Sequence, residues 1–407
     1  MSILDVDQIR SRFPALDRHV GEKPAVYFDG PGGSQTPQAV IDAIGGVLSR
    51  GISNLGGRFA ASDFAEEVVD GARQAARDYL GVPTGGEVAF GPSMTALTMI
   101  AAEALTPIMT EGDEIVVTRL DHDANISPWL FLAERTGAVI RWVDFDPEDE
   151  CRLGDVSVGP RTKLVAITHA SNALGVIPDV TAACRAAREV GAISYVDAVH
   201  HAAHSPVDMG KLDADFVAAS AYKFCGPHVG VLAMGPRVAH SVRPVHIRPV
   251  TPESPGWWER GTPSFEALAG VTAAVDYLAS LGEGSSRRDR LIESGRLTHA
   301  VTTNLVRRTF AGIEEMPGVS VIGPGAGGAR TPTLGVHVEG VHPATTAARL
   351  AEEGIFVWSG HNYALEVMRR LGKLESGGLV RVGFMHYNTE REVDRLLAVL
   401  DRVSTGG

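Results

Sequence analysis

The sequence predicts an α/β protein in which short apolar strands alternate with helices. Strand-like runs rich in Val, Ile and Ala occur at 114–118 and 163–168, and between such runs apolar residues recur at helical spacing, most clearly over 62–80. This alternation is typical of βαβ units, and so of a mostly parallel sheet with helices on both faces. A chain of 407 residues, 44% of them hydrophobic, can bury a large core and divide into two domains.

Composition and charge favour small-molecule chemistry. The chain has 37 Lys and Arg against 49 Asp and Glu, a formal net charge of −12, which argues against a nucleic-acid partner or an anionic membrane. No apolar run approaches the length of a membrane span, and the first twelve residues lack the apolar stretch of a signal peptide. Three scattered cysteines indicate neither a disulfide framework nor a metal site, which favours a cytoplasmic protein.

The first elements lead into a glycine-rich turn. A short helix is expected over 4–13, because Pro14 restricts the residue before it, and a strand is expected over 25–29. The turn at 30–34 has the glycines of a phosphate loop but lacks its lysine and the dinucleotide fingerprint. We therefore do not assign a nucleotide to this turn.

A candidate anion site follows the next strand. The stretch 87–95 indicates a strand and a tight turn that opens a helix over 96–105. Backbone N–H groups at a helix N-terminus, together with Ser and Thr hydroxyls, bind phosphate readily, so Ser93, Met94 and Thr95 form a candidate phosphate cup. The alternative is that Ser93 or Thr95 only caps the helix.

Polar residues follow the apolar strands throughout the first two thirds of the chain. Ligands of parallel sheets bind beyond the carboxyl ends of the strands, so shared placement predicts a shared site. A histidine here could instead be structural, and an asparagine could cap a turn. The candidates placed in this way are Ser93, Thr95, His122, Asn172, Asp197, His200, Ser220 and Lys223.

Lys223 needs the most explanation, because it lies between an apolar run that ends at Ser220 and the glycine-rich strand 229–235. Burying an ammonium costs several kcal/mol unless the group is paired or neutralised. A lysine that condenses with an aldehyde forms an imine and so avoids the cost of burying an ammonium. An acid, Asp197, lies 26 residues earlier, at the end of another apolar strand. Such a lysine and acid are the pair that pyridoxal 5'-phosphate (PLP) requires, although each alone could be a solvated turn residue.

These two segments also carry a family resemblance. Asp197–His200 (DAVH) and Ser220–Lys223 (SAYK) resemble the paired signature of the class V aminotransferase and cysteine desulfurase-like family of PLP-dependent enzymes. The resemblance implies the PLP-dependent transferase fold type I, with a large cofactor-binding domain over 25–282 and a smaller α+β C-terminal domain over 283–407. It also implies that the N-terminal segment 1–24 packs with the small domain.

The resemblance assigns roles to the candidates. Lys223 would hold the cofactor and act as the catalytic base, and His122, in the segment DHDANISPW, would stack on the pyridine ring and relay protons. Asn172 would hydrogen-bond the phenolic oxygen of the cofactor. His200 and Tyr222 replace a glutamine and a histidine of many relatives, and both can still hydrogen-bond the cofactor.

Two further motifs concern the substrate and a partner subunit. Arg381, in the run RVGFMHYNT, is the candidate for binding the α-carboxylate of an amino acid in a bidentate fork, and His361 is a second substrate contact. Thr262, in the run ERGTPS, resembles a residue that reaches the phosphate held by the neighbouring protomer. A homodimer with shared active sites is therefore expected. The second domain should contain helices over 291–310 and 343–353 and strands over 319–322 and 333–338.

The reaction is less determined than the cofactor. Cysteine desulfurases carry sulfur on a loop cysteine, and Tyr363 stands at that place here, while Cys151 and Cys184 are expected on surface segments. We therefore expect an enzyme that forms an external aldimine with an amino acid, with Lys223 as the base at Cα and no persulfide step. The favoured reaction is that of a C–S β-lyase acting on cysteine or a cysteine conjugate. The alternatives are an aminotransferase or an epimerase of an uncommon amino acid, or a PLP-fold binding or regulatory protein. Specificity is expected in loops 51–61 and 251–258.

Overall fold

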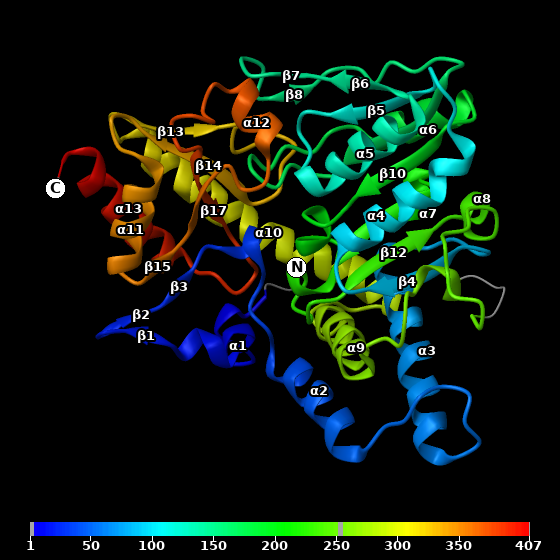
Figure 1. Ribbon diagram of the computed structural model, residues 1–407. Coiled ribbons are helices and arrows are strands. Elements are labelled where there is room, and N and C mark those ends of the chain that lie inside the picture. Colours follow the sequence, from blue (N-terminus) through cyan, green and yellow to red (C-terminus); the bar gives the residue numbers. More distant parts are fainter. Residues whose placement is uncertain (1–3, 251–254, 407) are drawn as a thin grey trace.

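The computed structural model describes residues 4–250 and 255–406. Its larger sheet (Figure 1) contains, in spatial order, β4 (Glu87–Gly91), β12 (Gly230–Met234), β11 (Phe216–Ser220), β10 (Ile193–Asp197), β9 (Thr162–Thr168), β5 (Glu114–Thr118) and β6 (Val139–Val143). All neighbouring strands pair in parallel except β12, which runs antiparallel to both β11 and β4. The predicted α/β class with a mostly parallel sheet is confirmed.

Helices cover both faces of this sheet because its strands are apolar on both sides. In β11, Phe216 and Ala218 pack into one core cluster and Val217 and Ala219 into another, as the two-residue period of a strand requires. The first cluster includes residues of α4 (Met94–Leu105) and α5 (Ser127–Thr136). The second includes residues of α3 (Ala60–Leu80), α6 (Val180–Glu189) and α9 (Phe265–Ala279). The helix α2 (Gln38–Arg50) packs against α9.

A second, antiparallel sheet follows in the C-terminal third of the chain and lies to the left of the large sheet in Figure 1. Its strands are β13 (Val319–Ile322), β14 (Thr333–Val338), β17 (Leu379–Gly383) and β16 (Trp358–Gly360). The helices of this part are α10 (Arg287–Glu314), α11 (Pro343–Glu352), α12 (Leu365–Arg370) and α13 (Glu390–Ser404). The predicted helix 291–310 is longer at both ends in the structure. It begins earlier because Ser286 and Asp289 form a capping box.

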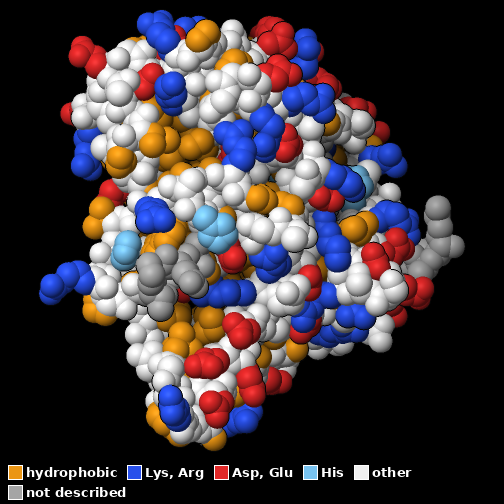
Figure 2. All heavy atoms as spheres, turned by 90° about the vertical axis from the view of Figure 1, so that its right-hand side faces the viewer, with side chains coloured by type: hydrophobic (Ala, Val, Ile, Leu, Met, Phe, Trp, Pro, Cys, Tyr) orange, Lys and Arg blue, Asp and Glu red, His pale blue; other side chains and the backbone are white. Residues whose placement is uncertain are grey.

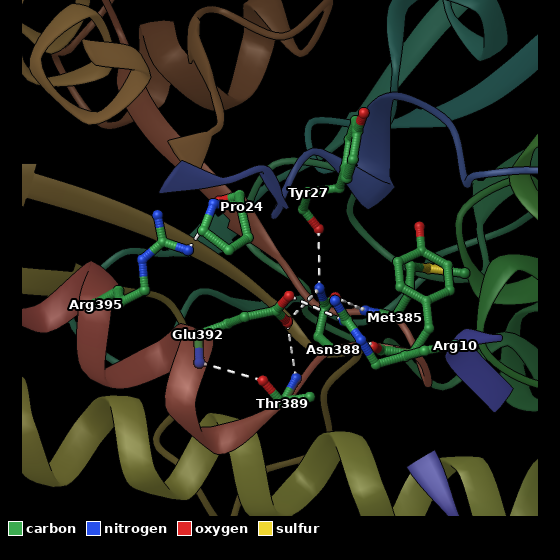
Figure 3. Close-up of polar contacts among 9 residues, drawn as sticks. Arg10, Pro24, Tyr27, Met385, Asn388, Thr389, Glu392 and Arg395 are labelled. Carbon is green, nitrogen blue, oxygen red and sulfur yellow. Dashed lines mark hydrogen bonds and ion pairs between the residues drawn. The ribbon is translucent and has the colours of Figure 1, made fainter. Parts of the chain in front are cut away.

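The N-terminal segment contacts the end of the chain (Figure 3). The helix α1 (Val6–Arg10) is shorter than predicted, and Arg10 donates hydrogen bonds to the carboxylate of Glu392 at 2.9 Å and to the carbonyl oxygen of Tyr387 at 2.8 Å. Arg395 of α13 donates to the carbonyl oxygen of Pro24 at 2.9 Å. These contacts join the two ends of the sequence, and the division of the chain at residues 24 and 282 stays a prediction.

Short elements complete the fold. They are the strands β1 (His19–Val20), β2 (Lys23–Pro24), β3 (Val26–Tyr27), β7 (Phe145–Asp146), β8 (Arg152–Leu153) and β15 (Ile355–Phe356), the helices α7 (Met209–Leu212) and α8 (Pro236–Ala239), and the 3₁₀ turns η1 (Pro14–Asp17), η2 (Gly30–Gly32), η3 (Thr106–Ile108), η4 (Asp123–Asn125), η5 (His201–Ala203), η6 (Ala221–Lys223) and η7 (Gly256–Trp258). Of these, η2, η4 and η6 contribute to the site.

The surface position expected for two cysteines is wrong. Cys151 and Cys184 have exposed fractions of 0% and 1%. Cys184 of α6 belongs to a hydrophobic cluster that also contains residues of the large sheet. Cys151 belongs to another cluster, together with Phe145 and Leu120. Among the described residues, no helix is long and apolar enough to cross a membrane.

Candidate active site

All ten residues predicted to hold the cofactor within one chain line a single cavity. The cavity lies at the carboxyl ends of β9, β10 and β11, beside the first turn of α4. The strand ends meet here because β9, β10 and β11 are parallel and in register, with Asp197 opposite Thr168 and Ala218. The predicted residues on its wall are Ser93, Met94, Thr95, His122, Asn172, Asp197, His200, Ser220, Tyr222 and Lys223.

One end of the cavity is the N-terminus of α4. Ser93 is the N-cap of this twelve-residue helix, and its hydroxyl accepts a hydrogen bond from the N–H of Ala96 at 3.1 Å. The capping alternative is therefore correct for the hydroxyl of Ser93, and the helix terminus still offers its positive end to an anion. A Cβ atom at Gly230 would overlap the backbone of Ser93 and Met94. The glycine thus lets β12 approach the turn closely enough to hold it in place.

Lys223 closes the 3₁₀ turn η6 and is buried. Its Nζ donates a hydrogen bond to the carbonyl oxygen of Pro31 in η2. Burial, with the nearby charge of Arg381 as a second cause, lowers the pKa of Lys223 from 10.5 to about 7, although Asp197 and Asp29 act in the opposite direction. Near neutral pH about half of the amine is therefore unprotonated, which is the nucleophilic form.

Asp197 ends β10 and places a carboxylate against the same cavity. Its Oδ1 accepts a hydrogen bond from the N–H of Val199 at 2.9 Å. Burial raises the pKa of Asp197 to about 6, while this bond and the charge of Lys223 oppose the rise. The carboxylate is consequently ionised for the most part at neutral pH although it is buried. A second buried acid, Asp121, lies nearby, and burial, with the charge of Asp197 as a further cause, raises its pKa well above the usual value.

His122 presents a neutral imidazole to the cavity. Its Nδ1 accepts a hydrogen bond from the N–H of Ala124 at 3.0 Å, so the proton of the neutral ring is on Nε2. Burial, with the charges of Lys223 and Arg381, lowers the pKa of His122 to about 4. The ring is stacked with that of Tyr363, with centroids 5.5 Å apart and planes inclined by 21°.

Asn172 and Arg381 each keep a polar atom without a partner. The Nδ2 of Asn172 donates to the carbonyl oxygen of Asn362 at 2.8 Å, while its buried Oδ1 makes no hydrogen bond. Arg381 donates from Nη1 to the carbonyl oxygen of Asn172 at 3.2 Å, and its buried Nε has no acceptor. Buried polar atoms in native proteins are nearly always paired, so these two atoms fit a site that is completed by a ligand.

His200 and Tyr222, the two departures from the family pattern, occupy the wall through different contacts. The Nε2 of His200 lies 3.1 Å from the hydroxyl of Thr331 and 3.0 Å from that of Thr333, while its buried Nδ1 has no partner. Tyr222 is stacked on His228 with centroids 4.7 Å apart, and the Nζ of Lys223 lies 5.1 Å from the centre of the Tyr222 ring. The imidazole is thus held from the side of β14.

A wider outer chamber opens from this cavity. The two spaces share Thr95, His122, Ala124, Asn172, Tyr222 and Lys223, and Arg381 and His361 line the outer chamber only. Thr262 lines neither space and is exposed, so its role toward a partner's cofactor stays a prediction. Within the described residues, neither loop expected to set specificity lines the chamber, and residues 251–254 lie outside that description.

Sequence reasoning did not single out several residues that lie in or beside the site. Asp29 has a buried Oδ1 without a partner, and burial raises its pKa to about 6 although the charges of Arg381 and Lys223 lower it. An acid at a strand end before a glycine-rich turn was the available signal. Trp358, Phe131 and Met99 line the outer chamber, and no local pattern marked them. Among the described residues no group of three or more His, Cys, Asp or Glu could hold a metal ion.

The donor set fits pyridoxal 5'-phosphate. A helix N-terminus suits its phosphate, an ionised buried carboxylate suits its ring nitrogen, and a neutral lysine suits its aldehyde. The flat neutral ring of His122 suits its aromatic face. Fold and site together define a PLP-dependent enzyme of fold type I.

Comparisons with known proteins agree. The aminotransferase class-V family model matches residues 26–396. A protein of Streptomyces coelicolor named "Probable cysteine desulfurase" is 32% identical to this chain. The alignment covers 98% of this chain and 97% of that one. The apo cysteine desulfurase of Thermococcus onnurineus superposes with a TM-score of 0.88 at 30% identity over 100% of both chains. A cysteine desulfurase of Escherichia coli gives 0.84 at 26% identity over 98% of both.

The chain therefore belongs to the aminotransferase class-V family, and its cofactor is pyridoxal 5'-phosphate.

Proposed function

We propose that the protein is a C–S β-lyase that acts on L-cysteine or an S-substituted cysteine. The reaction converts R–S–CH₂–CH(NH₃⁺)–COO⁻ and water into R–SH, pyruvate and ammonium. The observation that carries the proposal is the absence of a sulfur carrier from a site that otherwise resembles that of the cysteine desulfurases. Cys151, Cys184 and Cys225 are all buried and none lines either space. By the sequence resemblance, Tyr363 would stand where the desulfurases have their carrier cysteine.

We assign substrate binding and proton transfer to different residues of the site. Arg381 binds the α-carboxylate, because its buried guanidinium keeps an unpaired N–H beside the chamber. When bound, the cofactor supplies an electron sink that stabilises negative charge at Cα. Lys223 takes the proton from Cα, since a lysine with a pKa of about 7 accepts and releases a proton easily at neutral pH.

Two further groups hold the arrangement. Asp197 keeps a negative charge in the cavity, where it would pair with the protonated ring nitrogen of the bound cofactor. His122 offers an N–H at Nε2 and a flat face toward the same space, so it orients the cofactor and can deliver a proton to a leaving thiolate. Loss of the thiolate from Cβ gives an unsaturated amino acid, which hydrolyses to pyruvate and ammonium.

We also propose that the enzyme is a homodimer. Thr262 is exposed and lines neither space of its own chain, so a second chain is needed to bring it to a cofactor phosphate. Val245 and Ile247, on the segment before residue 251, have exposed fractions of 68% each. Figure 2 shows hydrophobic side chains gathered in patches between interspersed charges on one face of the molecule. Sedimentation velocity tests the proposal, and a monomer at micromolar concentration contradicts it.

The reaction is tested by product analysis. The purified enzyme, loaded with PLP, is incubated with L-cysteine and with S-methyl-L-cysteine, and pyruvate and ammonium are measured. Equal amounts of the two products support the lyase. A keto acid formed without ammonium, with the cofactor left as its amine, supports transamination instead, and loss of optical activity without other products supports an epimerase.

Matched variants identify the site. Lys223→Ala should abolish product formation, whereas Lys211→Ala, which changes an exposed lysine, should leave it unchanged. Activity in the Lys223→Ala variant would contradict the assignment of the base. A protein that binds PLP and transforms none of the amino acids offered favours the binding or regulatory alternative.

A further inference from the structure

Exposed aromatic side chains gather at the outer chamber. In the described residues, four large aromatic side chains, those of Phe59, Phe131, Trp358 and Tyr363, are exposed, with fractions between 52% and 67%. Three of them line the chamber, and Phe59 does not. Large aromatic groups left in water next to a cavity are unfavourable unless a ligand covers them. Their concentration at one place therefore indicates what the chamber binds.

The position of Tyr363 is held by its backbone. Asn362 and Tyr363 both adopt left-handed backbone conformations, with φ of 52° and 55°. Residues other than glycine seldom adopt such conformations. The N–H of Asp123 donates to the carbonyl oxygen of Tyr363 at 2.7 Å, and the N–H of Tyr363 donates to the Nδ1 of His361 at 3.0 Å. Strained residues held in this way are typical of binding sites. They fix the Tyr363 ring above His122, at the boundary between the two spaces.

Trp358 is fixed next to the carboxylate site. It lies directly opposite Arg381 on the neighbouring antiparallel strand, and such side chains share a face about 5 Å apart. A Cβ atom at Gly32 would overlap the indole nitrogen, so the absence of a side chain at this position leaves room for the indole. An amino acid held by Arg381 thus has the indole as an immediate neighbour.

Two helices that pack on the large sheet also contribute to the wall of the chamber. Met99 of α4 and Phe131 of α5 line the chamber, with exposed fractions of 39% and 52%. Arg381, the proposed partner of the α-carboxylate, and Lys223, the proposed base at Cα, line the same space. The outer part consequently offers aromatic rings and a thioether to the rest of a substrate, beside polar side chains such as those of Asp123, Ser127 and His361.

We propose that the outer chamber is a subsite for a flat aromatic group carried by the amino acid. The ring would lie among the side chains of Tyr363, Trp358, Phe131 and Met99. Together with the proposed C–S β-lyase activity, on which this step rests, the subsite assigns the substrate class as S-aryl or S-arylmethyl conjugates of L-cysteine. Aromatic pairs gain affinity beyond that of the buried area, which distinguishes a flat ring from a saturated group of the same size.

Binding of unreactive analogues tests the subsite separately from the reaction. The probes are 3-(benzylthio)propanoate, 3-(cyclohexylmethylthio)propanoate and 3-(methylthio)propanoate, which keep the carboxylate and the thioether but lack the amine. Titration calorimetry with the PLP-loaded enzyme should show the benzyl compound binding at least about tenfold more tightly than the methyl compound. It should also bind about threefold or more tightly than the cyclohexylmethyl compound.

Variants locate the effect. Tyr363→Ala and Trp358→Ala should each lower the ratio of benzyl to methyl affinity by about three- to tenfold while the dissociation constant of the methyl compound changes little. Ile292→Ala, which removes an exposed hydrophobic side chain outside the chamber, should leave the ratio unchanged. Far-ultraviolet circular dichroism confirms that each variant is folded, and Phe131→Ala replaces any that is not.

The outcomes separate the subsite from the reaction. Equal affinities for the three probes, or a preference that survives all of these substitutions, overturns the subsite whether or not pyruvate forms. Equal binding of the benzyl and cyclohexylmethyl compounds overturns the aromatic assignment. In a third outcome, the enzyme binds the benzyl probe most tightly and yet forms no pyruvate from S-benzyl-L-cysteine. This result overturns the lyase activity and the conjugate class but supports the aromatic subsite.

Discussion

The pKa of Lys223 makes a quantitative prediction for the loading of the apoenzyme with PLP. Only the neutral amine attacks an aldehyde, and burial lowers the pKa of this amine from 10.5 to about 7. Between pH 7 and pH 10 the neutral fraction of such a lysine rises only about twofold, from one half to nearly one. A lysine with the ordinary pKa would gain about 800-fold over the same interval. The rate constant for covalent attachment should therefore be nearly flat over this range.

The assay mixes apoenzyme with excess PLP at each pH and quenches samples with borohydride, after which the mass of the modified protein is measured. The window starts at pH 7 because the pKa of both Asp197 and Asp29 is about 6, so these carboxyls are already ionised. Lys223→Ala should show no attachment within the cavity, and Lys211→Ala should match the unmodified enzyme. A rise of more than about tenfold between pH 7 and pH 10 would refute the argument that burial neutralises Lys223.

Three further outcomes test the site and the fold. Arg381→Gln should weaken the binding of 3-(methylthio)propanoate about a hundredfold by calorimetry, because a charged hydrogen bond contributes up to about 3 kcal/mol, and Arg381→Lys should recover only part of this loss. Gly230→Ala should shift the turn at Ser93, lower the stability to urea by about 1–3 kcal/mol and weaken retention of PLP, whereas Gly159→Ala, with open space around its Cβ, should change neither. Burial lowers the pKa of His386 from 6.5 to about 4. As the pH falls below 6.5, this histidine is protonated in the unfolded chain but not in the native one, and the native protein loses stability. His386→Gln should therefore lose about 1.3 kcal/mol less stability to urea than the unmodified protein between pH 7.5 and 5.5, and an equal loss would contradict this pKa.

Local patterns were sufficient for most of the large sheet. The strand 114–118 agrees with β5 because its β-branched residues are bounded by polar ones, and α3 follows the apolar spacing predicted over 62–80. The helix α2 was not predicted, since its paired glycines, Gly45 and Gly46, lower helix propensity. Packing against α9 supplies the stability that its sequence lacks, and Gly270 leaves room there for Ile44.

Burial of polar groups was harder to predict than strand position. Cys151 was expected on the surface because its flanking residues are polar, yet it packs with Leu120 and Phe145. Asp29 was predicted only as the end of a strand, although it shares its surroundings with Arg381, which is more than 350 residues away in the sequence. Contacts of this kind depend on how the two sheets meet, and a local pattern carries no information about that.

The sequence by itself determined the alternation of strands and helices, and with it the edge at which Lys223, Asp197 and His122 would collect. Parallel strands place their carboxyl ends together, so the order of elements was enough to predict these neighbours. Only the tertiary structure decided the electrostatics, because a pKa of about 7 for Lys223 arises from burial and from Arg381, which the second sheet supplies. The tertiary structure also brought residues of β16, the turn after it, α4 and α5 around the outer chamber, and no spacing rule connects these parts of the chain.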